Sequence, residues 1–178
     1  GDTWIWNGNA WSQRFVVGPS ARSDHTMASW GSGVLLFGGR DTPGNTNKSD
    51  TWFWNGTSWA QLSPPHAPPE LAGHSMAYDS VRNRVVVFGG VKSGDIFSNE
   101  TWEFDGSDWT MVAASGPAPR FAQSMTFDSV RGKTVMYGGA LFFGTVFFDT
   151  WEWDGVAWTK KFEGGPPAQV YGSLTFDP

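Results

Sequence analysis

The segment DTWFWNGTSW, residues 50–59, carries three tryptophans at fixed spacing and occurs in four similar copies along a chain of 178 residues. The copies begin at Asp2, Asp50, Glu100 and Asp149, so the period lies between 48 and 50 residues. A period of this length is typical of units built from four strands rather than of helix pairs. The repeat therefore predicts an array of small, similar β units.

Each period contains the same four strand patterns, which we name a to d in chain order. In one copy they are GHSMAYDS (73–80), RNRVVVFGG (82–90), NETWEFDG (99–106) and SDWTMV (107–112). Alternating or short apolar runs bounded by Gly, Asn and Asp are typical of strands, and no segment has a helical pattern. One up-and-down sheet of four strands is predicted for each period.

The aromatic residues of strands c and d share one face. Trp52 and Trp54 are two positions apart, and Asn55-Gly56 favours a hairpin. A two-residue turn would place Trp59 opposite Trp52 and a four-residue loop would place it opposite Trp54, so both put it on the same face. Packing between neighbouring units explains this regularity better than ligand binding does. The equivalent aromatics are Trp4, Trp6 and Trp11; Trp102, Phe104 and Trp109; and Trp151, Trp153 and Trp158.

A double glycine after an apolar strand, a tryptophan about a dozen residues later and another after a short turn resemble the kelch repeat. The resemblance covers essentially the whole chain and implies an all-β, kelch-type β-propeller, with residues 1–178 as a single repeat region. Strand counting predicts three complete blades, strands c and d alone before them, and a lone strand a within YGSLTFDP (171–178). We expect a portion of a larger propeller or one completed by a second copy as an oligomer, with an open four-bladed ring as the alternative.

Composition limits the partners of the chain. The net charge of −5 and the lack of a basic run argue against nucleic acid, and the apolar runs are too short to span a membrane. The absence of cysteine excludes disulfides, thiolate nucleophiles and cysteine-based metal sites. The style rich in Trp, Gly, Asn and Thr suggests a secreted or cell-envelope bacterial protein.

No catalytic motif is present, and we expect no cofactor and no metal. His25 and His74 occupy equivalent strand-a positions, but the other copies have Gln123 and Gly172 there, so no metal site is repeated. Kelch enzymes resembling galactose oxidase need a cysteine-linked tyrosine, which this chain lacks, whereas a sugar isomerase similar to sialic acid mutarotases stays open. The repeated carboxylates at turns are expected to cap backbone groups. They are Asp79, Asp105, Asp128 and Asp154.

The two faces of such an array differ in sequence. The a–b and c–d turns are nearly uniform, whereas the b–c loops RDTPGNTNKS (40–49), VKSGDIFSN (91–99) and ALFFGTVFF (140–148) and the d–a loop SPPHAPPELA (63–72) all differ. Variable loops on a regular scaffold favour recognition. Candidate binding residues on this face are Arg22, Arg40, Lys92, Arg120, Phe142, Phe143 and Phe147.

Two of these groups have alternative interpretations. Kelch repeats often carry an arginine at the position of Arg22 and Arg120, and in some members it helps to bind acidic partners. Leu71 and Gln169 depart from that pattern, and the arginines can instead anchor loops through hydrogen bonds. The phenylalanines can pack beneath their loop or form an apolar contact surface for a protein, a neighbouring subunit or a sugar.

The sequence therefore favours a non-catalytic protein-interaction module that uses the variable loop face. A carbohydrate-binding propeller is the first alternative, because exposed aromatics beside Asn and Asp can stack on a sugar. A sugar isomerase or hydrolase is the second.

Overall fold

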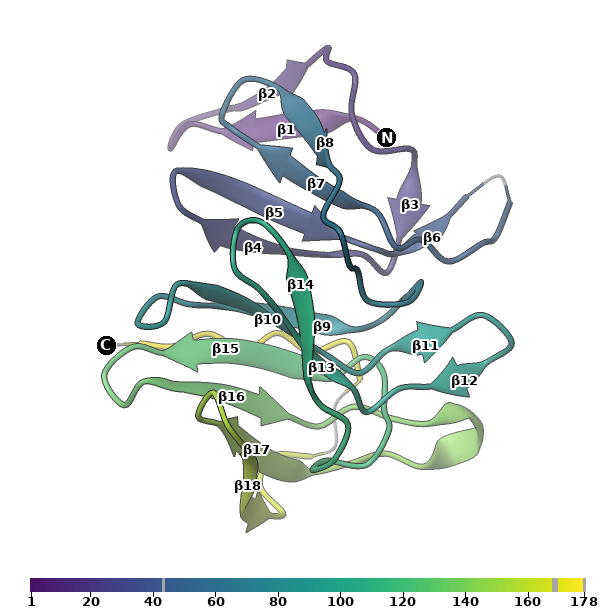
Figure 1. Cartoon of the computed structure of the whole chain (residues 1–178), viewed down its shortest axis with the longest axis vertical. Helices are drawn as coiled ribbons and strands as arrows, with labels where there is room; N and C mark the ends of the chain where they lie inside the picture. Colours follow the sequence, from purple (N-terminus) through teal and green to yellow (C-terminus); the bar gives the residue numbers. More distant parts are fainter. Residues whose placement is uncertain (43, 168–169, 178) are drawn as a thin grey trace.

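The computed structural model describes residues 1–42, 44–167 and 170–177, apart from the side chain of Phe143. Three sheets of four antiparallel strands, which we call blades 1 to 3, form most of it (Figure 1). Blade 1 contains β4 (Thr26–Trp30), β5 (Gly33–Phe37), β7 (Thr51–Trp54) and β8 (Trp59–Leu62). Blade 2 contains β9 (Ser75–Asp79), β10 (Arg84–Phe88), β13 (Thr101–Phe104) and β14 (Trp109–Ala113). Blade 3 contains β15 (Ser124–Asp128), β16 (Lys133–Tyr137), β17 (Asp149–Trp153) and β18 (Trp158–Glu163).

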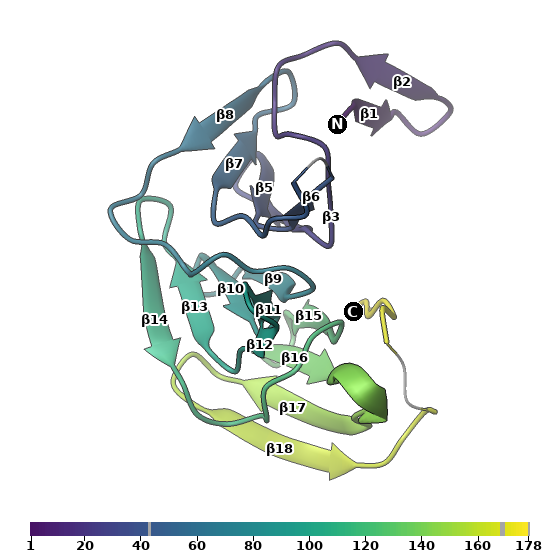
Figure 2. The ribbon, with the colours of Figure 1, turned by 90° about the vertical axis from the view of Figure 1, so that its right-hand side faces the viewer.

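A two-stranded sheet precedes blade 1, and we call it the N-terminal hairpin. It consists of β1 (Thr3–Trp6) and β2 (Trp11–Arg14), which correspond to strands c and d of a blade. Together with the three blades it confirms the predicted all-β propeller class, with a partial blade at the N-terminal end. The units follow one another along an arc, with β8, β14 and β18 outside and β9 and β15 toward the middle (Figure 2).

The c–d connection is a four-residue loop. Trp54 pairs with Trp59 across it, and the other units have the same register at Trp6–Trp11, Phe104–Trp109 and Trp153–Trp158. Gly56 adopts a φ of +96°, a backbone conformation that explains the glycine of this turn. Of the two turns considered from the sequence, the longer one is present.

The aromatic pair of each blade packs against the preceding unit. Trp109 and Phe104 of blade 2 lie in one core cluster with Leu35 and Phe37 of blade 1. A second cluster joins Trp153 and Trp158 of blade 3 to blade 2. At about 25 cal/mol per Å² and about 150 to 250 Å² each, a fully buried aromatic contributes roughly 4 to 6 kcal/mol as an upper bound. Neighbouring blades therefore hold one another in place.

The N-terminal hairpin is the exception, because no blade of the described chain covers its outer face. Its tryptophans Trp4, Trp6 and Trp11 are 49%, 51% and 64% exposed. The equivalent residues Trp109 and Trp153 are 1% exposed. Position in the array, rather than residue type, decides how deeply a tryptophan is buried.

The lone strand a expected near the C-terminal end is a wrong prediction, because residues 171–177 contain no strand and Pro178 lies outside the described residues. The segment is attached by two hydrogen bonds: Tyr171 N–H donates to the Ala122 carbonyl at 3.0 Å, and Ser124 Oγ donates to the Gly172 carbonyl at 2.7 Å. In each blade, strand a is paired along its length with strand b. Without such a neighbour, the alternating pattern is not sufficient to form a strand.

Candidate protein-binding face

The a–b and c–d turns form a regular surface held by their own side chains. Asp105 Oδ1 accepts the backbone N–H groups of Ser107 and Asp108 at 2.8 and 2.9 Å. These bonds, that from Asp108 first, lower the pKa of Asp105 to about 2. The same capping pattern occurs at Asp79, Asp128 and Asp154. The repeated carboxylates are therefore occupied by turn formation.

The opposite surface is built from pairs of loops, and we call it the loop face. In each blade the d–a segment that enters strand a lies beside the b–c loop of the same blade. The pairs are β3 (Arg22–Ser23) with β6 (Arg40–Asp41), Ala72 with Val91, and Phe121 with Ala140. Blade 2 adds the small hairpin β11 (Val91–Lys92) and β12 (Ile96–Phe97), and blade 3 adds the 3-10 turn η1 (Phe142–Gly144).

Arg120 anchors two of these loops from inside the protein. It is fully buried, and its guanidinium donates to both oxygens of Asp149 at 2.5 and 3.1 Å and to the Gly138 carbonyl at 3.0 Å. Burial raises the pKa of Asp149, but the hydrogen bonds from Arg120 and Trp151 outweigh it and keep the pKa below its ordinary value. The ring of Phe147 lies 3.9 Å from the guanidinium carbon. The guanidinium of Arg120 is therefore engaged by groups of the protein itself and holds the loops together.

Arg22 makes the equivalent arrangement in blade 1. It donates to both carboxylate oxygens of Asp50 at 2.6 and 2.9 Å and to the Gly38 carbonyl at 2.9 Å. Trp52 Nε1 donates to the same carboxylate at 2.7 Å. Because the acid lies 28 residues beyond the arginine, the pair closes the loops of one blade.

In blade 2 a lysine, rather than an arginine, pairs with the acid at the start of strand c. Leu71 stands where the other blades have arginine, and Lys92 from β11 instead donates to Glu100 at 2.7 Å. Trp102 Nε1 donates to the other oxygen of Glu100 at 3.0 Å. The acid at the start of strand c thus has a basic partner in each of the three blades.

The remaining cations of the b–c loop in blade 1 also have partners. Arg40 Nε donates to Asn47 Oδ1 at 3.1 Å, and Lys48 Nζ lies 2.7 Å from Asp41 Oδ2. The charge of Lys48 is balanced by Asp41, whereas Arg40 keeps its charge because Asn47 is neutral, and one such cation does not make a strongly basic surface. Among the described residues, the loop face therefore does not present a ring of free arginines that would favour an acidic partner.

Aromatic side chains from three segments meet on the loop face, and we call Phe97, Phe121 and Phe142 the aromatic cluster. The ring centroids of Phe97 and Phe142 are 4.8 Å apart, and those of Phe121 and Phe142 are 5.1 Å apart. Tyr171 joins the cluster at 5.9 Å from Phe121. Phe142 and Phe147 are half-buried, whereas the side chain of Phe143 lies outside the described part of the chain.

Several apolar side chains in the segments that supply the aromatic cluster, or in contact with it, are open to solvent. Ile96, Phe148 and Tyr171 are 60%, 47% and 65% exposed. Ile96, Phe97, Phe121 and Tyr171 are not among the candidate binding residues predicted from the sequence, because they come from three separate segments of the chain and none belongs to a motif. The double phenylalanines of residues 140–148 were the only local signal for this region.

Strand a of each blade lines a central cavity of about 360 Å³ together with residues 172–174. Among the residues that the structure describes, His74 lies there without a well-aligned hydrogen bond to either ring nitrogen, and Oε1 of Gln123 and Nδ1 of His25 have no partner. Burial, with a smaller contribution from His25, lowers the pKa of His74 to about 3, so its imidazole is neutral at physiological pH. Within the described residues, no group of three or more His, Cys, Asp or Glu side chains is placed to hold a metal ion.

This combination of repeated blades, paired loops and buried arginine–acid anchors defines a β-propeller repeat domain. The family model of the KLHDC2/KLHL20/DRC7 kelch-repeats domain matches residues 24–173. The chain therefore belongs to the kelch-repeat family, as its double glycines and tryptophans predicted.

A curated relative has the same kind of repeat. Dynein regulatory complex subunit 7 of Chlamydomonas reinhardtii is 30% identical over 106 residues, which cover 56% of this chain and 9% of that protein. The chain thus spans less than a tenth of the length of the curated relative it matches. No helix in the described part of the chain is long and apolar enough to cross a membrane.

Proposed function

We propose that the chain is a non-catalytic protein-interaction module that binds an apolar segment of a partner through the loop face. The observation that carries the proposal is the aromatic cluster on the loop face, with exposed Ile96 next to Phe97 in the chain and exposed Tyr171 against Phe121. Contiguous exposed apolar groups with a polar surround are typical of protein-binding surfaces.

The electrostatics of the loop face support an apolar partner over an acidic one. Arg22, Lys92 and Arg120 are each bound to a carboxylate of their own blade, so a partner would have to replace an internal ion pair to use them. The relative supports a role in assembly, since its name describes it as a subunit of a complex. A secreted or cell-envelope location and a bacterial source stay predictions from composition.

The test places a photo-reactive cross-linking amino acid at position 96, with the same amino acid at position 130 as the matched control. Ile96 and Val130 are both aliphatic and are 60% and 75% exposed, but Val130 lies in an a–b turn on the opposite surface. A protein captured from position 96 and not from position 130 is then purified and titrated against the unlabelled chain by calorimetry.

We expect Ile96→Asp to weaken that binding by about 30-fold or more, as removal of a central interface residue does, and Val130→Asp to leave it unchanged. Equal loss in both variants, or none in either, would contradict the proposed surface. Binding of a purified glycan that Ile96→Asp abolishes would favour the carbohydrate alternative instead.

A further inference from the structure

One hydrogen bond recurs at every junction between units. The first tryptophan of strand d donates its indole N–H to the threonine that opens strand c of the preceding unit. The three bonds are Trp59 to Thr3 at 2.9 Å, Trp109 to Thr51 at 3.0 Å and Trp158 to Thr101 at 2.8 Å. Each unit therefore has a donor side that faces the preceding unit and an acceptor side that faces the following one.

The junction between blades 2 and 3 shows the acceptor side in more detail. Besides the bond to Thr101, Trp153 Nε1 donates to Glu103 Oε1 at 2.8 Å. Arg82 holds the Glu103 carboxylate with two bonds of 2.7 and 3.0 Å. This acceptor side thus combines a threonine hydroxyl with a carboxylate oriented by an arginine.

Blade 3 carries the same acceptor side on its outer face. Thr150 and Glu152 occupy the positions of Thr101 and Glu103, and Arg131 binds Glu152 as Arg82 binds Glu103. Lys161 also lies 3.6 Å from the Glu152 carboxylate. Among the hydrogen bonds of the described residues, neither Thr150 nor Glu152 receives an indole N–H.

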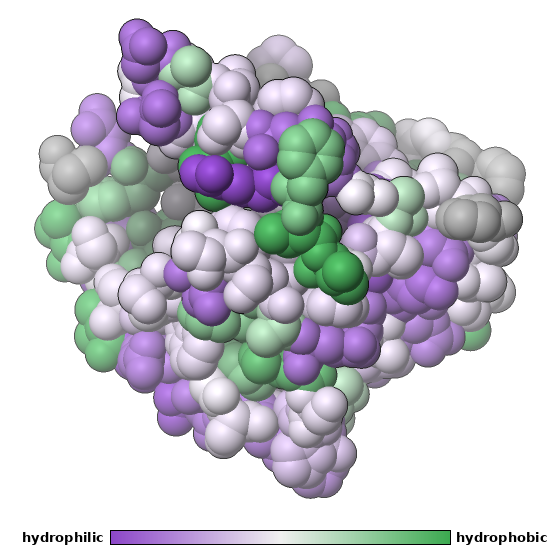
Figure 3. All heavy atoms as spheres, turned by 90° about the horizontal axis from the view of Figure 1, so that it is seen from above, coloured by the Kyte–Doolittle hydropathy of each residue, from purple (hydrophilic) through white to green (hydrophobic). Residues whose placement is uncertain are grey.

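The N-terminal hairpin carries an open donor side. The rings of Trp6 and Trp11 are 5.5 Å apart at 46°, and the rings of Trp153 and Trp158 are 5.6 Å apart at 41°. The exposed fractions differ sharply, since Trp11 is 64% exposed and Trp158 is 9% exposed. Seen from above, a few apolar side chains protrude on this end of the molecule among white and purple ones (Figure 3). The donor side of the hairpin therefore has the ring geometry of a buried donor side, although no blade of the described chain covers it.

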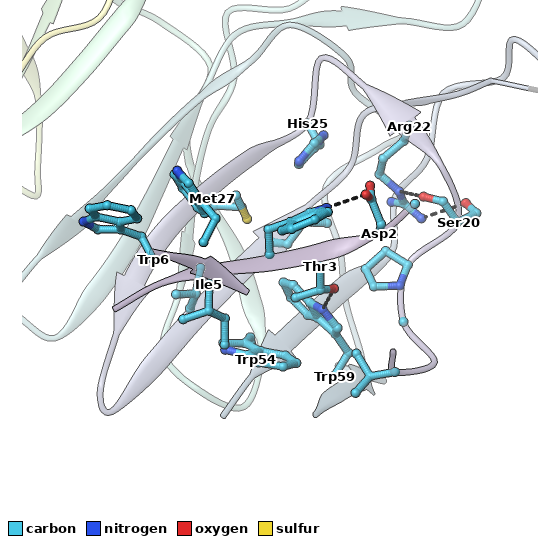
Figure 4. Close-up of a pocket in the computed structure, with 18 residues that line it drawn as sticks. Asp2, Thr3, Ile5, Trp6, Ser20, Arg22, His25, Met27, Trp54 and Trp59 are labelled. Carbon is cyan, nitrogen blue, oxygen red and sulfur yellow. Dashed lines mark hydrogen bonds between the residues drawn. The ribbon is translucent and has the colours of Figure 1, made fainter. Parts of the chain in front are cut away.

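A groove lies beside the hairpin, at a place where the other junctions are filled by side chains of the preceding blade. The cavity between β1 and blade 1 has a volume of about 580 Å³, and Figure 4 shows Met27, His25 and Trp54 along it. Met27 is 53% exposed, whereas Met76 at the equivalent position of blade 2 is 7% exposed. The free edge of β1 also lacks the strand-b partner that β7, β13 and β17 have.

The space around the turn glycines also differs between blade 1 and the other two blades. A Cβ at Gly106 or Gly155 would lie 2.7 or 2.6 Å from a side chain of the preceding blade, whereas one at Gly56 would meet nothing within 4 Å. Blade 1 thus has unfilled space where blades 2 and 3 contact the end of strand a or the a–b turn of the preceding blade.

We propose that a second copy of this chain docks head to tail, with its N-terminal hairpin on blade 3 of the first copy. Trp11 of the second copy donates to Thr150 of the first, and Trp6 faces Glu152. The argument is self-complementarity: both halves are present in one chain, and the chain already joins such halves three times within itself.

The contact joins two different surfaces, so the complex grows by addition of copies unless the arc closes into a ring. The expected solution masses are multiples of 19.5 kDa. This surface is separate from the loop face, so the two proposals succeed or fail independently.

The first experiment measures mass against concentration by light scattering and sedimentation equilibrium. Wild-type chain is expected to associate, Thr150→Val to raise the dissociation constant by about tenfold through loss of the acceptor, and Trp11→Ala by about 30-fold or more. Phe15→Ala is the matched control, since Phe15 follows the same hairpin, is 89% exposed and takes no part in the repeated tryptophan–threonine bond. It is expected to associate like wild type.

The second experiment separates head-to-tail docking from symmetric association. Trp11→Asp blocks only the donor side and Thr150→Arg only the acceptor side, so each variant alone is expected to be monomeric. An equimolar mixture retains one intact donor side and one intact acceptor side and is expected to form a heterodimer. Circular dichroism establishes whether each variant is folded. If a Trp11 variant does not fold, the association of Thr150→Val still tests the proposed contact.

A wild-type chain that is monomeric up to about millimolar concentration would overturn the proposal, as would equal association of the Trp11→Ala and Phe15→Ala variants. A mixture of the two blocked variants that stays monomeric, although wild type associates, would also rule out the head-to-tail contact.

Discussion

The buried pair of Arg120 and Asp149 is expected to contribute more to stability than any exposed ion pair of the chain. Their side chains are 1% and 9% exposed, and Arg120 also donates to the carbonyls of Gly138 and Ala118. Replacing Arg120 with methionine keeps much of the volume but removes the positive charge and two of the donors to the Asp149 carboxylate, which then retains the bond from Trp151. It also removes the guanidinium donor to the Gly138 carbonyl. Removing one partner of a buried pair costs about 3 to 5 kcal/mol in free energy of unfolding.

The cost of Arg120→Met should depend on pH in a defined direction. The folded-state pKa of Asp149 lies below its ordinary value of 3.8, so the carboxylate contributes stability above about pH 4 and loses it as the pH falls through the folded-state pKa. Without Arg120, burial is opposed by fewer interactions, so the pKa of Asp149 is expected to be higher in the variant than in wild type. The difference between wild type and variant is therefore full at pH 7 and shrinks under acid conditions.

Urea titrations at pH 7 and pH 3.5 measure this difference. The double variant Arg120→Met/Asp149→Asn should recover part of the loss at pH 7, because it removes the uncompensated charge. Lys160→Met is the surface control, since Lys160 and Glu163 are 38% and 73% exposed, and it should cost less than about 1 kcal/mol. A cost below about 1 kcal/mol for Arg120→Met, or one that does not change with pH, would refute the assigned role.

Two further predictions concern the strand-a surroundings. The pKa of His74 is lowered from 6.5 to about 3 in the folded protein. Because the unfolded chain binds a proton below pH 6.5 and the folded chain does not, the free energy of unfolding is full above pH 6.5. It falls as the pH drops toward 3, by up to about 1.4 kcal/mol per pH unit. His74→Gln, which copies Gln123 of blade 3, should remove that part of the slope in urea midpoints measured at pH 7 and pH 4.5; an unchanged slope would contradict the assignment. Gly90→Ala should lower the thermal midpoint more than Gly94→Ala does. A Cβ at Gly90 would lie 2.9 Å from that of His74, whereas one at Gly94, also at positive φ, meets nothing within 4 Å; equal midpoints would count against the close approach.

Strand positions and blade number were accessible from the sequence because their causes are local. Alternation along residues 73–80 and the Asn-Gly turn at Asn55 act within a few residues of each strand. The shared face of Trp52, Trp54 and Trp59 followed from strand parity alone. The failed strand at residues 171–177 shows the limit of such reasoning, because a strand also needs a partner edge.

The candidate site could be predicted only in part from the sequence, because its contacts are not local. The loop face could be located, since its sequences vary from blade to blade, but its contacts join residues far apart in the chain. Arg120 meets Asp149 across 29 positions, and the aromatic cluster draws Phe97, Phe121 and Phe142 from three loops. No local pattern indicates which of these groups are buried and which face a partner.

By itself, the sequence determined that this chain is a row of four-stranded kelch blades, each with a tryptophan-rich c–d hairpin. Only the tertiary structure decided that each hairpin packs on the preceding unit, which buries Trp109 and leaves the equivalent Trp11 exposed. The physical reason is that strand formation depends on neighbouring residues, whereas burial depends on which blade lies against the face. The same ten-residue motif therefore forms a core in blades 2 and 3 and an open surface in the N-terminal hairpin.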